Sequence, residues 1–173
     1  MMSTFLGAGR RTAPPDRGRP TVRFERVLDA PQARVYEVWT RPEHIVKWWR
    51  PRHFHRIDLE AMDVRPGGEL RFRMFHPEGA QYVSSSIYRE VEPTSRLVYF
   101  ETCYEDNRLF HKGLQAVSFD ALGERTRVEV CCYIEWVADR PAHFTTEFML
   151  DMWLDGWKDN GDCLAQYLAA PNE

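Results

Sequence analysis

The stretch from His143 to Ala170, HFTTEFMLDMWLDGWKDNGDCLAQYLAA, decides the architecture that we expect for this chain. Its apolar residues recur at the three- and four-residue spacing of one helical face, whereas its aspartates fall on the opposite side. A continuous helix of about 24 residues would be about 36 Å long. The sequence Asp159-Asn160-Gly161 is typical of a break, so an interrupted helix is the alternative. The face that we expect to be buried consists of Met149, Met152, Trp153, Gly156, Trp157, Leu164 and Leu168.

Residues 56–134 contain six stretches that favour β-strands, and the segments at 65–68, 76–80, 92–95 and 121–125 between them supply the glycine or proline of a turn. In the clearest stretch, Leu70 and Phe72 alternate with Arg71 and Arg73, which predicts a sheet with one buried and one solvated face. Consecutive strands joined by short turns form an antiparallel meander. The six strands are expected at 56–64, 69–75, 81–91, 96–103, 113–122 and 125–134.

The stretch VRFERVL, from Val22 to Leu28, predicts a further strand, and two short helices follow it before the meander begins. For the first helix, Asp29 is a possible N-cap and Pro31 lies near the first helical position. Seven strands spaced about 4.8 Å apart would make a sheet nearly as wide as the C-terminal helix is long. That helix could therefore cross the whole sheet.

The second short helix carries two adjacent tryptophans, Trp48 and Trp49. Thr40 and Glu43 have the spacing of a capping box at its start. Pro51 disfavours helical geometry at the residue before it, so we expect the helix to end at about Trp49. Neighbouring helical residues point about 100° apart. We therefore expect Trp48 in the core and Trp49 near the opening of a cavity.

The composition fits one globular domain, which we place at residues 21–170. The 173 residues include 43% hydrophobic and 28% charged residues, with a formal net charge of −3 that gives no basic field for nucleic acid. No stretch is long and apolar enough for a membrane span or a signal peptide. Residues 1–20 are rich in arginine and proline, and we expect them to form a disordered arm.

The four cysteines lie in apolar stretches and show no CxxC spacing. We expect them to be buried, reduced thiols of a cytoplasmic protein. The sequence also lacks a nucleophile elbow, a phosphate-binding glycine loop and a dinucleotide fingerprint, which argues against ordinary hydrolases, kinases and dehydrogenases. The cysteines are Cys103, Cys131, Cys132 and Cys163.

One strand, two short helices, six antiparallel strands and a long helix is the element order of the α+β helix-grip fold. The residues that carry a family resemblance are Ala30-Pro31, Trp39, Trp48-Trp49, DVRPGG at 63–68, YREVEPTSRLVY at 88–99 and DGWKDNGDCLAQYL at 155–168. The chain resembles the START-like (SRPBCC) superfamily, and within it the proteins related to the activator of the Hsp90 ATPase. The resemblance implies a curved sheet around the long helix, with a cavity between them, and members that bind lipids, polyketides or other hydrophobic molecules.

The walls of such a cavity would come from the inner face of the sheet, the inner side of the last helix and the short helices. Methionine adapts to varied ligand shapes and glycine leaves volume, although simple core packing is the alternative for most of these positions. No cofactor is implied, and the chain could be a monomer or a homodimer. The ligand-binding candidates are Trp39, Trp48, Trp49, Phe54, Phe72, Met74, Tyr99, Glu101, Phe119, Met149, Met152, Trp153 and Gly156.

Glu101 and His111 are the candidates for catalysis. An inward Glu101 would lose hydration, which raises its pKa and suits it to acid–base work. The outward orientation stays open, because a shift of one residue in register reverses the face. His111 could equally be a surface residue. His53 and His55 precede Asp58, but a third ligand at a recognised spacing is missing, so no metal site is predicted.

Three functions follow from the residues and the resemblance. The first is the binding of a hydrophobic or aromatic small molecule, lipid- or polyketide-like, between the sheet and the C-terminal helix. The second is a polyketide cyclase or aromatase type of enzyme that uses one acid–base residue in the cavity. The third is a regulator of the Hsp90 ATPase. Because better-known relatives use a further N-terminal domain for that role, and only a short arm precedes residue 21, we expect no stimulation of this ATPase.

Overall fold

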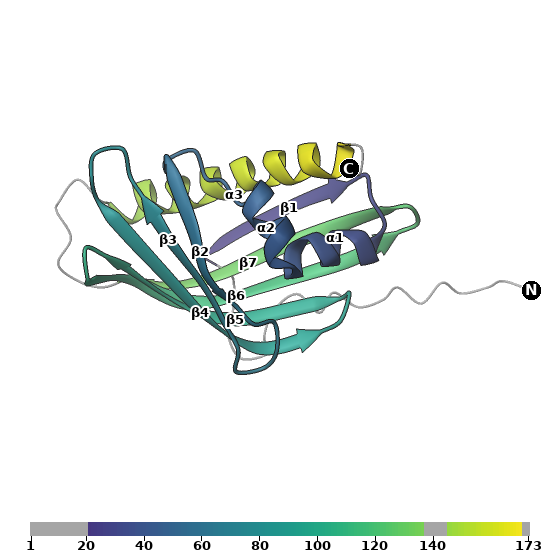
Figure 1. The fold of residues 1–173 in the computed structure, drawn as a ribbon, viewed down its shortest axis with the longest axis horizontal. Coiled ribbons are helices and arrows are strands. Elements are labelled where there is room, and N and C mark those ends of the chain that lie inside the picture. Colours follow the sequence, from purple (N-terminus) through teal and green to yellow (C-terminus); the bar gives the residue numbers. More distant parts are fainter. Residues whose placement is uncertain (1–20, 137–144, 171–173) are drawn as a thin grey trace, which may run out of the picture.

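A computed structural model of the chain describes residues 21–136 and 145–170. They form a seven-stranded antiparallel sheet and three helices, as Figure 1 shows. This is the predicted α+β helix-grip architecture. The helices are α1 (Gln32–Thr40), α2 (Pro42–Trp48) and α3 (Thr146–Ala169). The strands are β1 (Val22–Leu28), β2 (Arg56–Met62), β3 (Glu69–Phe75), β4 (Gln81–Glu92), β5 (Arg96–Glu105), β6 (Arg108–Leu122) and β7 (Arg125–Trp136).

The sheet is a meander closed by the first strand. Its order is β1-β7-β6-β5-β4-β3-β2, so β2 to β7 pair in the order of the sequence and β1 returns to pair with β7. The curved sheet lies on one side of all three helices (Figure 1). α1 packs against β6 and β7, α2 against β2, and α3 against β1 and α2. The predicted meander and long covering helix are therefore confirmed.

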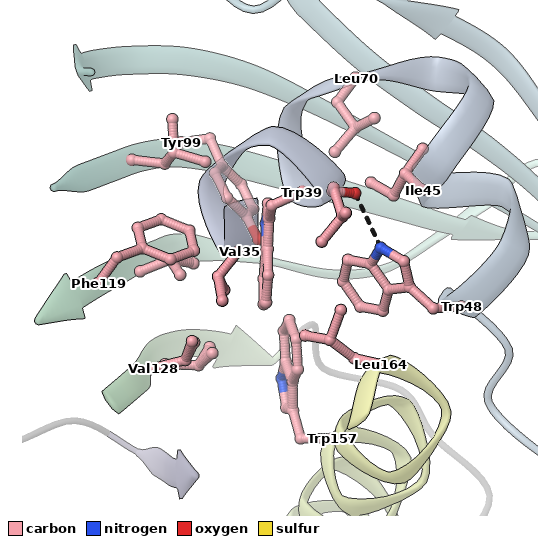
Figure 2. Close-up of a cluster of buried hydrophobic side chains, with 14 of the residues drawn as sticks. Val35, Trp39, Ile45, Trp48, Leu70, Tyr99, Phe119, Val128, Trp157 and Leu164 are labelled. Atoms are coloured by element: carbon pink, nitrogen blue, oxygen red, sulfur yellow. Dashed lines mark hydrogen bonds between the residues drawn. The ribbon is translucent and has the colours of Figure 1, made fainter. Parts of the chain in front are cut away.

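The main core fills the space between the inner face of the sheet and the three helices. Trp39, Trp48 and Trp157 converge at its centre from α1, α2 and α3 (Figure 2). The rings of Trp39 and Trp157 are nearly parallel, with 6.2 Å between their centroids, and the Trp39 and Trp48 rings are 4.7 Å apart. Each buried indole removes about 150–250 Å² from water, a gross gain of about 4–6 kcal/mol before entropy is subtracted. The tryptophans thus join all three helices to the sheet.

The starts of the two short helices differ from the prediction. Pro31, and not Asp29, is the N-cap residue of α1, and no side chain caps this helix. The proposed capping box is also wrong, because the N-cap residue of α2 is Arg41. Thr40 still belongs to α1, and its hydroxyl donates to the carbonyl of Tyr36 at 2.7 Å. Only the extended residue Arg41 separates the two helices, which leaves Thr40 no room to act as a cap for α2.

Helix α3 runs unbroken through Asp159-Asn160-Gly161, so the continuous alternative is confirmed. Thr145 caps its start by accepting a hydrogen bond from the amide of Phe148 at 3.1 Å. Gly161 is buried, and a Cβ at this position would lie 2.6 Å from the ring of Phe24 on β1. Glycine therefore lets the helix backbone approach β1 closely, and this packing offsets its poor helix propensity.

Strands β5 and β6 extend further than predicted and form a tight hairpin. The turn residues Asp106 and Asn107 have positive φ angles of 45° and 67°, and Glu105 pairs with Arg108. This is the backbone of a two-residue hairpin turn, for which Asx residues are well suited. The predicted start of β6 at residue 113 is therefore five residues too late. As a result, His111 lies within a strand and not in a loop.

The outer face of the sheet is not uniformly solvated, contrary to the prediction. Around β2 and β3 it is polar, and Glu60 pairs with Arg71 and Arg73. Across β5, β6 and β7, however, a second buried cluster lies on the side opposite the described helices. It alternates along each strand with residues of the main core, so both faces are apolar at this place. The cluster consists of Val98, Leu114, Ala116, Cys131 and Tyr133, with Phe100 packed against it.

Candidate functional site

Glu101 points to the inner face of the sheet and is 8% exposed. Both oxygens of its carboxylate accept hydrogen bonds, one from the hydroxyl of Ser84 on β4 and one from the side-chain amide of Gln115 on β6. Nε2 of His111, also on β6, lies 3.5 Å from the carboxylate. We call Ser84, Glu101, His111 and Gln115 the polar cluster. It settles the open question of orientation, because both catalytic candidates face inward.

The polar cluster keeps Glu101 ionised. Burial by itself raises the pKa of Glu101, but the nearby imidazole of His111 and the hydrogen bonds from Ser84 and Gln115 outweigh it, so this pKa lies below its ordinary value. The sequence-based expectation of a raised pKa is therefore wrong, and the reason is the set of donors around the carboxylate. An ionised Glu101 is a weak base, and its suitable task is to orient the imidazole of His111.

Two further buried groups extend the polar cluster toward the core. The hydroxyl of Tyr99 lies 3.3 Å from the side-chain oxygen of Gln115, to which it donates, and the thiol of Cys132 lies 3.9 Å from the same oxygen. Burial raises the pKa of Tyr99, helped by the charge of Glu101, so this phenol stays protonated. Hydrogen bonds therefore run continuously from Tyr99 through Gln115 to Glu101.

A row of aromatic rings leads from the polar cluster to the rim of the sheet. Trp153 of α3 meets His111 edge to face, with 4.8 Å between the ring centroids. Phe110 contacts His111 on one side and Tyr82 on the other, at 5.5 Å in each case. Tyr82 in turn contacts Phe54, also at 5.5 Å. The imidazole of His111 is thus held between rings, and Phe54 links the row to the surface.

A groove of about 350 Å³ opens between α2 and the inner side of β2 and β3. Its volume lies within the range of small-molecule sites. Phe72, on its wall, pairs across the sheet with Ser84 of the polar cluster. The lining also includes Phe54, the outer end of the aromatic row. The groove is lined by Val46, Trp49, Arg50, Phe54, His55, Arg56, Ile57, Leu59 and Phe72.

The groove brings together three of the predicted ligand-binding residues, Trp49, Phe54 and Phe72. Trp48 is fully buried and donates from its indole nitrogen to the carbonyl of Val38 at 2.9 Å, drawn as the dashed line in Figure 2. Trp49 is only partly buried. The two indoles thus divide between core and opening as expected, whereas their part in ligand binding stays a prediction.

The other candidates lie away from the groove. Trp39, Tyr99, Phe119 and Met149 are at most 3% exposed. Trp39, Tyr99 and Phe119 belong to the main core, and packing accounts for their burial. Met74, Met152, Trp153 and Gly156 are partly buried, and open space adjoins Gly156.

Sequence reasoning missed Ser84 and Gln115 in the polar cluster and Arg50, Ile57 and Leu59 in the groove. Ser84 has the same strand parity as the buried core residue Tyr88, and Gln115 has the same parity as Val117, so strand parity was the available signal. Within the described residues, no group of three or more His, Cys, Asp or Glu side chains is arranged to hold a metal ion. No helix of the described segments has the length and apolar character needed to cross a membrane.

Residues 29–169 match the protein family described as "Activator of Hsp90 ATPase homolog 1-like protein". The chain belongs to this family. Among proteins with curated descriptions, none matches this AHSA1-family chain.

Several solved structures share the fold of this AHSA1-family chain. Protein CV1439 from Chromobacterium violaceum has a TM-score of 0.65 and 24% identity, over 87% of this chain and 98% of its own. Protein Ms6760 from Mycobacterium smegmatis has a TM-score of 0.68 and 19% identity, over 87% and 91% of the two chains. DynU16, from the dynemicin biosynthetic locus, has a TM-score of 0.55 and 22% identity over 85% of this chain and 46% of DynU16. These identities are low, so the likenesses show the fold alone.

Proposed function

We propose that this AHSA1-family protein binds a hydrophobic or aromatic small molecule, lipid- or polyketide-like, in the groove between α2 and β2–β3. The observation that carries the proposal is the groove of about 350 Å³, walled by Trp49, Phe54 and Phe72. Its place differs from the expected cavity between the sheet and the C-terminal helix, because its lining comes from α2, the segment that follows it, β2 and β3, and includes no described residue of α3.

The shape of the wall supports this proposal. The rings of Trp49 and Phe72 are nearly parallel, with 5.3 Å between their centroids. This stacked pair forms an apolar part of the groove lining, against which an acyl chain or an aromatic ring can lie. Val46, which also lines the groove, is 40% exposed and adds apolar surface that a ligand can cover.

Ligand binding can be tested by native mass spectrometry and by a thermal-shift panel of lipids and aromatic compounds. Mass spectrometry of the protein purified from its own host should reveal a retained small molecule. Compounds from the panel should raise the Tm of the native protein by several degrees, and Trp49→Ala should remove this shift. Leu122→Ala is the matched control, because Leu122 is 43% exposed and lies outside the groove. A panel without any shift, together with no retained molecule, would contradict the proposal.

The polar cluster supports a second candidate, an acid–base reaction of the cyclase or aromatase type. In this reaction, Glu101 would orient His111, and the imidazole would exchange a proton with a ligand that reaches the inner end of the aromatic row. Incubation with a poly-β-keto thioester, followed by mass spectrometry, should yield a cyclised product. His111→Gln should abolish conversion while leaving binding in the groove intact. A wild-type protein that binds this thioester without converting it would leave binding as the function.

A further inference from the structure

We infer that the ligand of the groove is an anionic amphiphile, and that Arg50 receives its charged group. The inference rests on the proposed function, because it specifies the chemistry of the same groove. The segment 47–56 surrounding the opening contains Lys47, Arg50, Arg52 and Arg56 and no acidic residue. Such a concentration of positive charge beside an apolar wall selects for negative charge in the occupant.

The carboxylates of neighbouring segments already engage two of the arginines. Arg52 pairs with Asp159 of α3 at 2.8 Å. Arg56 binds Asp58 through two hydrogen bonds, and its guanidinium also lies 4.8 Å from the centre of the Phe75 ring. These pairs cancel much of the positive charge of Arg52 and Arg56. Their local contribution to anion binding is correspondingly small.

Arg50 differs from both neighbours. It lines the groove and is exposed, and among the described residues no carboxylate forms an ion pair with it. Its backbone amide donates to the side chain of Asn160 on α3 at 2.9 Å, so the base of this side chain is fixed. A guanidinium with free donors in this position can receive a carboxylate or sulfonate through two parallel hydrogen bonds.

The interior of the fold decides the direction in which such a ligand lies. Phe72 of the groove wall pairs across the sheet with Ser84, and Ser84 donates a hydrogen bond to the ionised Glu101. Glu101 therefore lies on the inner side of the groove wall. A second negative charge placed near Glu101 would be repelled in a poorly hydrated environment. The apolar body of the ligand should therefore lie along Trp49 and Phe72, with its anionic group outward at Arg50.

The test compares decanoate with 1-decanol, which share the chain length and differ in charge. Dissociation constants are measured by calorimetry for the wild type and for Arg50→Gln, Lys47→Gln and Trp49→Ala. The ratio of decanoate to decanol affinity should fall about fivefold in Arg50→Gln, the size of one partly exposed ion pair. Lys47→Gln removes the same charge three residues away, outside the groove lining, and should leave the ratio nearly unchanged. Trp49→Ala should weaken both compounds alike.

The outcomes separate this inference from the function on which it rests. If both compounds bind, Trp49→Ala weakens both and Arg50→Gln leaves the ratio unchanged, the groove is a hydrophobic site and the assignment of Arg50 is overturned. If Lys47→Gln lowers the ratio of decanoate to decanol affinity as much as Arg50→Gln does, the general positive charge around the groove attracts the anion. A specific contact with Arg50 is then excluded, and the assignment of Arg50 is equally overturned. If neither compound binds the wild type, this result contradicts the proposed function itself.

Discussion

Trp48 and Trp49 are adjacent in sequence and have different neighbours. The indole nitrogen of Trp48 donates to the carbonyl of Val38 in the last turn of α1, where backbone carbonyls lack partners within the helix. Trp49 instead stacks on Phe72 at the groove. The first residue therefore joins two helices, whereas the second is available for a ligand.

Because the two tryptophans have different neighbours, replacing each by phenylalanine should lower the free energy of unfolding by different amounts. Trp48→Phe removes a buried hydrogen bond and leaves a gap, so we expect a loss of about 2–3 kcal/mol in the free energy of unfolding. Trp49→Phe keeps an aromatic ring at a partly exposed site and should cost less than about 1 kcal/mol. Urea unfolding monitored by circular dichroism measures both values. Equal losses would show that Trp49 has a structural role as large as that of Trp48.

Glu101 predicts a stability that depends on pH. A carboxyl group whose pKa is lower in the folded chain stabilises the fold above its unfolded pKa, and this contribution is lost as the pH falls through the folded pKa. Since Glu101 has such a lowered pKa, Glu101→Gln should cost about 1–3 kcal/mol at pH 7. The difference from the wild type should shrink below about pH 4.

Urea unfolding from pH 7 down to pH 3.5 checks this dependence. Glu78→Gln is the matched control, because Glu78 lies exposed in the turn between β3 and β4 and should show little difference at any pH. A Glu101→Gln difference that stays constant with pH would mean that shape, and not charge, is what the carboxylate contributes.

At the scale of the element, the two glycines of α3 give opposite predictions. Nothing described lies within 4 Å of a Cβ at Gly156, so Gly156→Ala should stabilise the helix by about 0.5–1 kcal/mol. A Cβ at Gly161 would collide with Phe24, so Gly161→Ala should destabilise the protein by about 1–3 kcal/mol despite the same gain in propensity. Thermal unfolding of both variants provides the comparison. If Gly161→Ala stabilised the protein, α3 and β1 would not be packed as closely as the structure indicates.

The sequence predicts regular strands well and their ends less well, for local reasons. The limits of β1 and β3 follow from alternation between charged and apolar residues, and Glu69 and Phe75 bound β3 as expected. The hairpin between β5 and β6 has neither glycine nor proline in its turn, because Asp106 and Asn107 adopt the positive φ angles themselves. The sequence therefore gives no turn signal here, and the predicted strand begins too late to include His111.

The orientation of Glu101 depends on a different ambiguity. Val98 and Phe100 belong to the outer cluster, while Tyr99 and Glu101 face the inner side, so both faces of β5 are apolar. The alternation of polar and apolar residues along β5 therefore does not show which face is the inner one. The orientation of Glu101 follows only from the pairing of β5 with its neighbouring strands. The groove was harder still to foresee, because α2, β2 and β3 come together there only in the folded chain.

At the scale of the whole molecule, the fold is held together without disulfides, since none of the four cysteines forms one. Burial raises the pKa of Cys131 to about 11, and Cys103 and Cys132 are also buried. We expect a thiol reagent to modify only Cys163 rapidly in the native protein, and the other three after unfolding. A reductant should leave the Tm unchanged within about 1 °C. A titre of three or four fast thiols would show that the sheet opens readily.

The pairing of β1 with β7 has a consequence for how the protein is made. The side chain of Thr21 accepts a hydrogen bond from the amide of Ile134, 113 positions away. A ribosome adding about 5–20 residues per second needs roughly 6–23 s between the two. During that time β2 to β6 can pair in turn, whereas β1 has no partner and the apolar side chains of Val22 and Leu28 stay uncovered. The first strand to be synthesised is the last to pair, so the nascent chain passes through a state in which that strand needs protection.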